Sequence, residues 1–189
     1  MCFFPNSLFS RHHRHHHHHD HYHHNKHHHN RRREPRRMPT IYIVSYAVSR
    51  NVPNQIHARV HRHTRPNIPI VAEIQCMNWQ PPADHLCRQY SGLSQIIRDE
   101  VLRLNPRALV RIREALNKAT DHLQSGRTRS GDCVVLTCCV AGTHRSVTAA
   151  EVLKQELTQY EGVWEGLRVV VKHLDRQLRP GDPRRVRFA

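Results

Sequence analysis

The sequence predicts one α/β domain with a mostly parallel sheet and flanking helices, preceded by a disordered tail. The first indication is residues 134–140, a continuous apolar and β-branched run that is typical of a strand buried on both faces. The second is the short glycine-containing loop and the helical apolar pattern that follow this run directly. The third is the length of 189 residues, which suits one domain with a substantial core.

The first 39 residues differ in composition from the rest of the chain. Residues 1–40 hold 13 of the 20 histidines and 8 of the 30 lysines and arginines, with only two acidic residues. Such a segment cannot bury enough apolar surface to fold, so residues 1–39 are predicted to be a disordered, low-complexity, His- and Arg-rich tail. We expect the folded domain over residues 40–178 and a basic tail over residues 179–189.

The remaining elements follow from local patterns, taken in chain order. Strands are expected where β-branched residues predominate, over residues 41–46, 70–76 and 167–171. Helices are expected where apolar residues recur at helical spacing, over residues 93–104, 105–125 and 147–159. Residues 50–69 contain three prolines and several arginines, and this stretch is expected to be irregular.

Charge and cysteine usage restrict the class of protein. Residues 41–189 keep 22 basic against 13 acidic side chains, which leaves +9 of the formal net charge of +15 outside the tail. This excess favours polyanionic partners such as RNA without defining a site. The six cysteines show neither a zinc-finger spacing nor a disulfide framework, so no metal site is expected.

No apolar run approaches the length of a membrane span, and the first ten residues are too short for a secretory signal. We therefore expect no membrane partner and a location in the cytoplasm, with the nucleus as the alternative.

The loop after the central strand lies at the carboxyl end of that strand. At a helix start, the backbone amides of residues 141–146 lack partners, and the helix dipole adds partial positive charge. Gly142 allows a positive φ angle or a close backbone approach, and Arg145 offers a two-pronged donor. The pattern predicts an anion-binding site; the alternative is an ordinary turn that Ser146 caps while Arg145 is solvated.

The same residues resemble a known family. The run Cys139–Val147 resembles the Cys-Thr-Gly-Gly-x-His-Arg-Ser-Val loop of the carboxyl-terminal domain of RapZ, the bacterial RNase adapter protein. Weaker matches follow in the expected order, at Ser45-Tyr46, Glu73-Ile74-Gln75, Ser91-Gly92-Leu93-Ser94 and Lys172-His173-Leu174-Asp175. The likeness spans residues 41–176 and is strongest at the loop.

This resemblance implies an α/β domain that binds an amino-sugar phosphate at the loop and that, in the bacterial protein, also binds small RNA. It implies that the ligand contacts Cys139, Val140, Ala141, Gly142, Thr143, His144, Arg145, Ser146 and His173. The kinase-like P-loop domain of that family has no counterpart in this sequence, so neither ATP chemistry nor a cofactor is expected. Val140 and Ala141 replace Thr and Gly, and Gln75 replaces Arg, so the sugar-reading side departs from the family more than the phosphate-reading side.

A second interpretation is enzymatic. Cys139-x5-Arg145-Ser146 also satisfies the signature of cysteine-dependent phosphatases, in which a thiolate attacks phosphorus while loop amides hold the phosphate oxygens. Asp84 is then the candidate general acid, although Cys138 stands where those enzymes have histidine. Because His144 matches the adapter family and the phosphatase pattern places no demand there, we favour a non-catalytic domain that binds a phosphorylated small molecule, with RNA as a further candidate partner.

Overall fold

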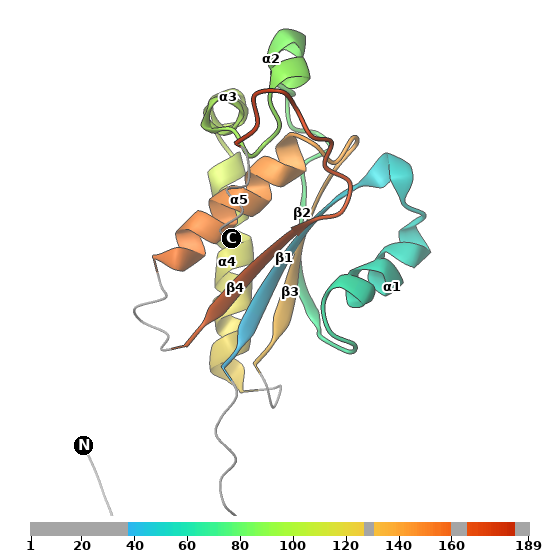
Figure 1. The fold of residues 1–189 in the computed structure, drawn as a ribbon. Coiled ribbons are helices and arrows are strands. Elements are labelled where there is room, and N and C mark those ends of the chain that lie inside the picture. The colour runs from blue at the N-terminus through green and yellow to red at the C-terminus, as the bar shows by residue number, and fades with distance from the viewer. Residues whose placement is uncertain (1–37, 127–130, 160–165, 184–189) are drawn as a thin grey trace, which may run out of the picture. The chain divides into compact units, whose positions relative to one another are not determined.

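The computed structural model describes residues 38–126, 131–159 and 166–183. Within this part of the chain, four parallel strands form one sheet in the order β2-β3-β1-β4 (Figure 1). The strands are β1 (Thr40–Ala47), β2 (Ile70–Gln75), β3 (Cys133–Cys139) and β4 (Arg168–His173). The prediction of an α/β domain with a mostly parallel sheet is confirmed.

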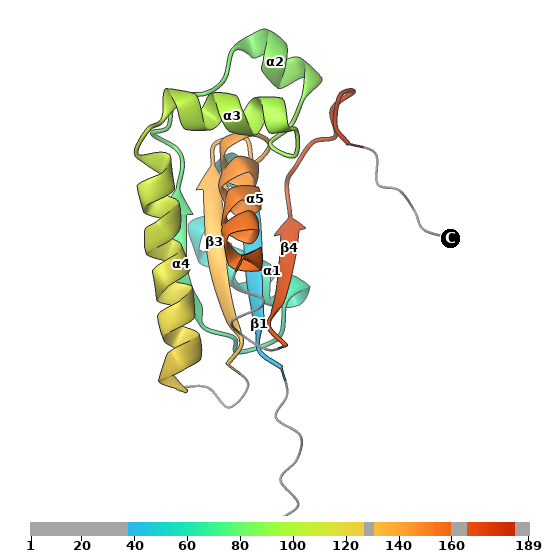
Figure 2. The same cartoon turned by 90° about the vertical axis from the view of Figure 1, so that its left-hand side faces the viewer.

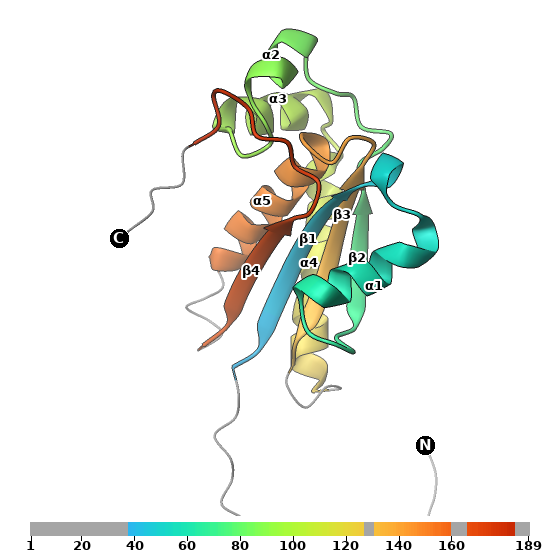
Figure 3. The same ribbon diagram turned by 45° about the vertical axis from the view of Figure 1, so that its right-hand side comes forward.

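Helices cover both faces of the sheet. They are α1 (Pro53–His63), α2 (Asp84–Gln89), α3 (Gln95–Leu104), α4 (Ala108–Ser125) and α5 (Arg145–Thr158), and the 3-10 turn η1 (Val48–Arg50) follows β1. Figure 2 shows α4 and α5 side by side on one face, with α2 and α3 beyond the carboxyl ends of the strands. Figure 3 shows α1 on the opposite face. None of the helices in the described residues is long and apolar enough to cross a membrane.

Helix α1 corrects one expectation, because residues 50–69 were expected to be irregular. Pro53 stands at the start of this helix, where a missing backbone N–H costs nothing and the fixed φ angle suits a helix. Ile56 and Val60, one helical turn apart, are buried against the sheet. Two apolar residues among polar ones make too short a stripe to indicate a helix from sequence alone.

The core has two halves, one on each side of the sheet. Ile41 and Ile43 of β1 pack beneath α4 and α5, whereas Tyr42 and Val44 pack beneath α1. β1 and β3 are the inner strands and are buried along their whole lengths. Burial on both faces explains why these segments are nearly continuously apolar rather than alternating.

The order of the strands determines where a ligand has room. β1 and β3 are neighbours, and their last residues, Ala47 and Cys139, are paired in register. The chain leaves β1 toward α1 on one face and leaves β3 toward α5 on the other face. In open α/β sheets, ligands bind in the crevice that forms outside such a pair of strand ends. The loop between β3 and α5 is therefore at the expected place for a site.

Candidate functional site

The loop between β3 and α5 turns through Gly142. This glycine has a φ angle of 69° and is buried. A Cβ atom on Gly142 would lie 2.9 Å from both the Cβ and the backbone N of Ala47, and 3.0 Å from the Cβ of Asp175. Both reasons for glycine that the sequence suggested, a positive φ angle and a close backbone approach, are therefore present at this position.

Buried side chains brace the loop from the inside. The Sγ of Cys139 accepts a hydrogen bond from the amide of Gly142 at 3.2 Å and lies 3.1 Å from the Oγ of Ser146. Thr137 donates its hydroxyl to the carbonyl oxygen of Ser146 at 2.8 Å. Cys139 is 2% exposed and Ser146 is fully buried. These two residues fix the shape of the loop and lie beneath its surface.

Several backbone amides at the start of α5 have no acceptor within the described residues. Among the residues that the structure describes, no acceptor is in hydrogen-bonding geometry with the amides of Ala141, Thr143, His144 and Arg145. Val140 and Ala141 are exposed. Unpaired amides at the start of a 14-residue helix, together with the helix dipole, favour an anion.

Arg145 links the loop to the segment that follows β2. Its Nη1 group donates to the carbonyl oxygen of Met77 at 2.9 Å and to that of Trp79. Its Nε and Nη2 groups have no acceptor within the described part of the chain. The guanidinium is thus held by one edge, and its two-donor edge remains free.

His144 is turned toward α2. Its Nε2 lies 3.0 Å from the carbonyl oxygen of Cys87, so this nitrogen carries the proton and donates it. Burial lowers the pKa of His144, and the nearby positive charges of Arg179 and Arg145 act in the same direction. The neutral imidazole attaches the loop to α2.

Two further segments lie against the loop. Gly92 donates its amide to the carbonyl oxygen of Thr143 at 3.0 Å, and a Cβ on Gly92 would lie 2.5 Å from the carbonyl oxygen of His144. The amide of Gln177 donates to the Oγ1 of Thr143 at 3.3 Å. Thr143 is therefore buried between the turn before α3 and the segment after β4.

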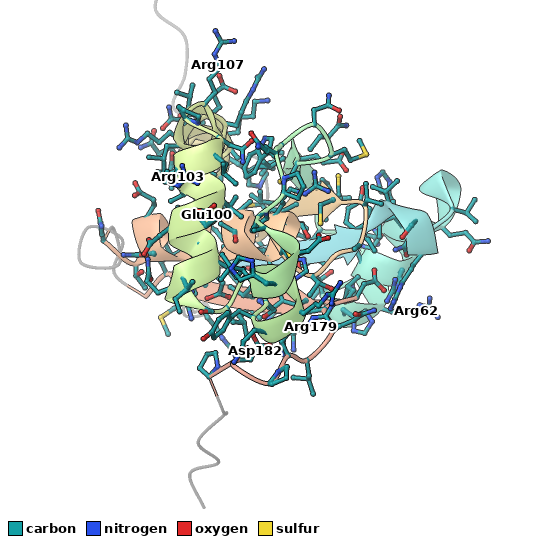
Figure 4. All side chains as sticks on the ribbon, turned by 90° about the horizontal axis from the view of Figure 1, so that it is seen from above. Arg62, Glu100, Arg103, Arg107, Arg179 and Asp182 are labelled. Carbon is teal, nitrogen blue, oxygen red and sulfur yellow. The ribbon has the colours of Figure 1, made fainter. Side chains whose placement is uncertain are left out.

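The segment after β4 is held in place through Asp182. This carboxylate pairs with Arg176 at 2.8 Å and accepts the amide of Ser91 at 2.7 Å and that of Arg179 at 3.1 Å. Figure 4 shows Arg179 beside Asp182 in the view from above. No sequence pattern indicated these contacts, since a basic, proline-containing stretch is typical of a loose tail.

Asp175 is a site residue whose role the sequence did not reveal. Its carboxylate accepts hydrogen bonds from the amide of Ala47 at 2.9 Å, from Asn51 at 3.0 Å and from Arg59 at 2.9 and 3.1 Å. Burial raises the pKa of Asp175, but these hydrogen bonds and the charge of Arg59 outweigh it and hold the pKa below its usual range. The loop thus rests on an ionised and fully paired carboxylate.

His173 is not in hydrogen-bond contact with the loop in the described residues. Its Nδ1 lies 2.8 Å from the Oγ of Ser45, and its Nε2 lies 3.0 Å from the Oε1 of Glu151. Ser45 is fully buried, so this chain of polar groups ties β1, β4 and α5 together and presents no nucleophile. Burial raises the pKa of Glu151, but the bond to His173 and nearby positive charges outweigh it, so the pKa is lowered.

The enzymatic interpretation requires Cys139, Arg145, Ser146 and the acid Asp84. The Sγ of Cys139 lies 3.1 Å from the Oγ of Ser146. Asp84 is exposed in the first turn of α2, and no hydrogen bond joins it to Cys139 or Arg145 in the described residues. The described cysteines are free thiols. Within the same residues, no three His, Cys, Asp or Glu side chains are arranged to hold a metal ion.

Comparison with known proteins identifies one family. The sequence model for the RapZ C-terminal domain matches residues 39–177, which is most of the folded part of the chain. No curated protein matches the sequence.

We expect Gly142→Ala to destabilise the domain more than Gly126→Ala does. Both glycines have positive φ angles, 69° and 59°, so the conformational cost of alanine is common to the two variants. A Cβ on Gly126 meets nothing within 4 Å, whereas a Cβ on Gly142 crowds Ala47 and Asp175. The difference in the free energy of unfolding, measured by urea titration, should be about 1–3 kcal/mol. Equal losses would show that the loop is not closely packed on β1.

The carboxylate of Asp175 should make stability depend on pH. Because its pKa is lower in the folded chain than in the unfolded chain, its contribution is complete above the unfolded pKa and is lost as the pH falls toward the folded pKa. The free energy of unfolding should therefore drop as the pH is lowered from about 5 to about 2. Asp175→Asn should reduce this slope, and Asp121→Asn, on the exposed face of α4, should not. An unchanged slope in Asp175→Asn would contradict this assignment.

Proposed function

Because this chain belongs to the RapZ C-terminal domain family, we propose that it binds a phosphorylated small molecule of the amino-sugar phosphate class at the loop over residues 139–146. The observation that carries the proposal is the set of unpaired amides at Ala141, Thr143, His144 and Arg145, at the start of α5 and beside the paired ends of β1 and β3. A phosphate group supplies acceptors to several amides at once, and its negative charge is favoured by the helix dipole.

Arg145 is the side chain best suited to the phosphate. Its Nη1 is engaged by the carbonyl oxygens of Met77 and Trp79, so the side chain loses little conformational freedom on binding. Its Nε and Nη2 form the edge that makes two parallel hydrogen bonds to a phosphate or a carboxylate. Arg145 therefore acts as a preorganised donor in the proposed site.

Cys139, Gly142 and Ser146 then serve as supports rather than as contacts. The sulfur of Cys139 is buried beside Gly142 and Ser146, and the exposed Asp84 lies on a separate helix. A phosphatase requires a thiolate that can reach the phosphorus atom. The burial of this thiol favours binding over turnover, and the proposal requires no cofactor.

Calorimetry with glucosamine 6-phosphate tests the site in the full chain. Wild-type protein should bind, and Arg145→Ala should weaken binding by about tenfold or more, because a charge-assisted pair of hydrogen bonds is lost, about 1.5–3 kcal/mol. Arg113→Ala, which removes an exposed arginine of α4, should bind as the wild type does. Equal affinity of the Arg145→Ala variant and the wild type would count against the site.

Two controls separate binding from catalysis. Glucosamine without the phosphate should bind much more weakly than the phosphate ester. An aryl phosphate should not be hydrolysed by the wild type, by Cys139→Ser or by Arg145→Ala. Turnover by the wild type that disappears in Cys139→Ser would establish a phosphatase instead.

RNA binding is a second candidate function, favoured by exposed arginines near the carboxyl ends of the strands. Arg103 at the end of α3 and Arg107 in the turn before α4 are exposed, and both are labelled in Figure 4. Arg103 is paired with Glu100 at 2.8 Å, whereas Arg107 has no ion-pair partner in the described residues. Sequence-independent contacts of this kind are made to phosphate groups.

Binding of RNA should therefore weaken steeply as salt rises, because contacts to phosphates release counterions. Filter binding of a labelled single-stranded RNA between 50 and 200 mM salt, about the range over which such contacts are lost, measures this slope. Replacing Arg103 and Arg107 by Glu should reduce the slope, and removing residues 1–37 should weaken binding without abolishing it. An affinity that does not change with salt would contradict this electrostatic account.

A further inference from the structure

The segment after β4 brings a second arginine, Arg179, to the neighbourhood of the loop. The amide of Gln177 donates to the Oγ1 of Thr143 in the loop at 3.3 Å. The amide of Gly181 donates to the carbonyl oxygen of Gln89, the last residue of α2, at 2.8 Å. Arg179 lies between these two attachment points along the chain. The residue is therefore held between the loop and α2, at the carboxyl ends of the strands (Figure 4).

The guanidinium of Arg179 has unused donors. Its Nη2 donates to the Oε1 of the exposed Gln177 at 3.0 Å, and the group forms no other hydrogen bond within the described residues. Its Nε is buried without a partner. Three buried side-chain atoms lack a partner in the described part of the chain, and this is the only one that belongs to a permanently charged group. A buried donor of this kind costs free energy until an acceptor reaches it, so it indicates a place for an anion.

Within the described residues, no carboxylate neutralises Arg179. The acid nearest to it in the sequence is Asp182, whose carboxylate is already occupied by Arg176 at 2.8 Å and by the amide of Ser91 at 2.7 Å. The same carboxylate accepts the backbone amide of Arg179 at 3.1 Å, and it forms no ion pair with the guanidinium. The charge of Arg179 is thus available to an external anion.

Arg179 and Arg145 act on the same surroundings. Burial lowers the pKa of His144, and both charges lower it further, with no carboxylate among the described residues opposing them. Burial and the charge of Asp84 raise the pKa of the Cys87 thiol, and both arginines oppose this increase. Asp84 forms no ion pair with either arginine in the described part of the chain. Two guanidinium groups with free donors therefore lie near His144.

The two arginines approach the loop from opposite sides. Arg145 is held on the carbonyl oxygens of Met77 and Trp79, in the segment after β2. Arg179 lies in the segment after β4, and β2 and β4 are the outer strands on opposite edges of the sheet. With neighbouring strands about 4.8 Å apart, the outer strands are separated by about 14 Å. This arrangement favours two anionic groups on one ligand over a single phosphate that both side chains share.

We propose that Arg179 contacts a second anionic group of the ligand, so that the preferred ligand is a sugar phosphate that carries a further phosphate or carboxylate group. This inference rests on the proposed function, in which the loop amides and Arg145 hold the first phosphate. A guanidinium binds a phosphate or a carboxylate through charge-assisted hydrogen bonds. The site then selects its ligand by the number of anionic groups as well as by the sugar.

Calorimetry with the full chain compares ligands that have one and two anionic groups. Glucosamine 1,6-bisphosphate against glucosamine 6-phosphate tests a second phosphate, and 6-phosphogluconate against glucose 6-phosphate tests a carboxylate. In at least one pair, the ligand with two groups should bind about tenfold more tightly, because it gains charge-assisted hydrogen bonds. Salt of about 0.15 M screens charges more than about 8 Å apart, so general attraction to a basic chain contributes little.

The outcomes separate this inference from the proposed function. Equal affinities within both pairs overturn the inference. If the monophosphates bind and lose affinity in Arg145→Ala, the proposed function stands even when the inference fails. Binding of none of the four ligands overturns both.

Arg179→Gln locates the second contact. The variant should fold, because the side chain makes one hydrogen bond in the described residues, to the exposed Gln177. It should remove most of the advantage of the ligands with two anionic groups and leave the affinity for the monophosphates unchanged. Arg88→Gln, the same loss of charge at an exposed position of α2, should keep the advantage.

Three results with these variants would overturn the inference. Equal effects of Arg179→Gln and Arg88→Gln would mean that only the overall charge matters. Equal weakening of ligands with one and two anionic groups by Arg179→Gln would place this arginine on the first phosphate. Weaker binding of single-stranded RNA by Arg179→Gln, with no change for the sugar phosphates, would assign the arginine to RNA.

Discussion

The carboxylate of Asp175 is the interaction on which the arrangement of the loops depends. It joins the segment after β4 to the end of β1 through the amide of Ala47 and to α1 through Arg59, and its Cβ lies directly beneath Gly142. One side chain thus sets the relative positions of both strand ends at the crevice and of the loop above them. Arg59 has a second effect, which is to neutralise this carboxylate. Without the charge of Arg59, the uncompensated carboxylate of Asp175 would lie under a loop whose amides favour anions.

The strands and helices could be predicted where burial alone determines the pattern of apolar residues. β1 and β3 are inner strands covered on both faces, so their β-branched runs were recognisable, and α4 and α5 show long apolar stripes. Helix α1 was missed because Ile56 and Val60 are its two apolar contacts with the sheet, and because the prolines and basic residues of the stretch 50–69 are typical of a loop. Short helices on a covered face leave a weak signal because the sheet, rather than the helix sequence, supplies most of the packing.

In the candidate site, features set by neighbouring residues could also be predicted, whereas contacts between residues far apart in the sequence could not. The turn at Gly142 and the start of α5 at Arg145 follow from neighbouring residues and were predictable. The partners of Arg145 and His144 lie 66 to 68 and 57 residues away, in segments that periodicity does not connect to the loop. His173 was expected beside the ligand on resemblance alone, but its hydrogen bonds run to Ser45 and Glu151, partners that depend on strand order.

The contact between Arg145 and the segment after β2 has a thermodynamic consequence. The same guanidinium that offers a free edge to the loop donates to the carbonyl oxygens of Met77 and Trp79. A ligand that drew Arg145 away from these oxygens would leave them without their donor, so the conformation of the segment after β2 and the affinity of the loop are linked. By reciprocity, a change that displaces Met77 or Trp79 alters the affinity of the loop by the same free energy. A single arginine thereby couples the segments that follow two neighbouring strands.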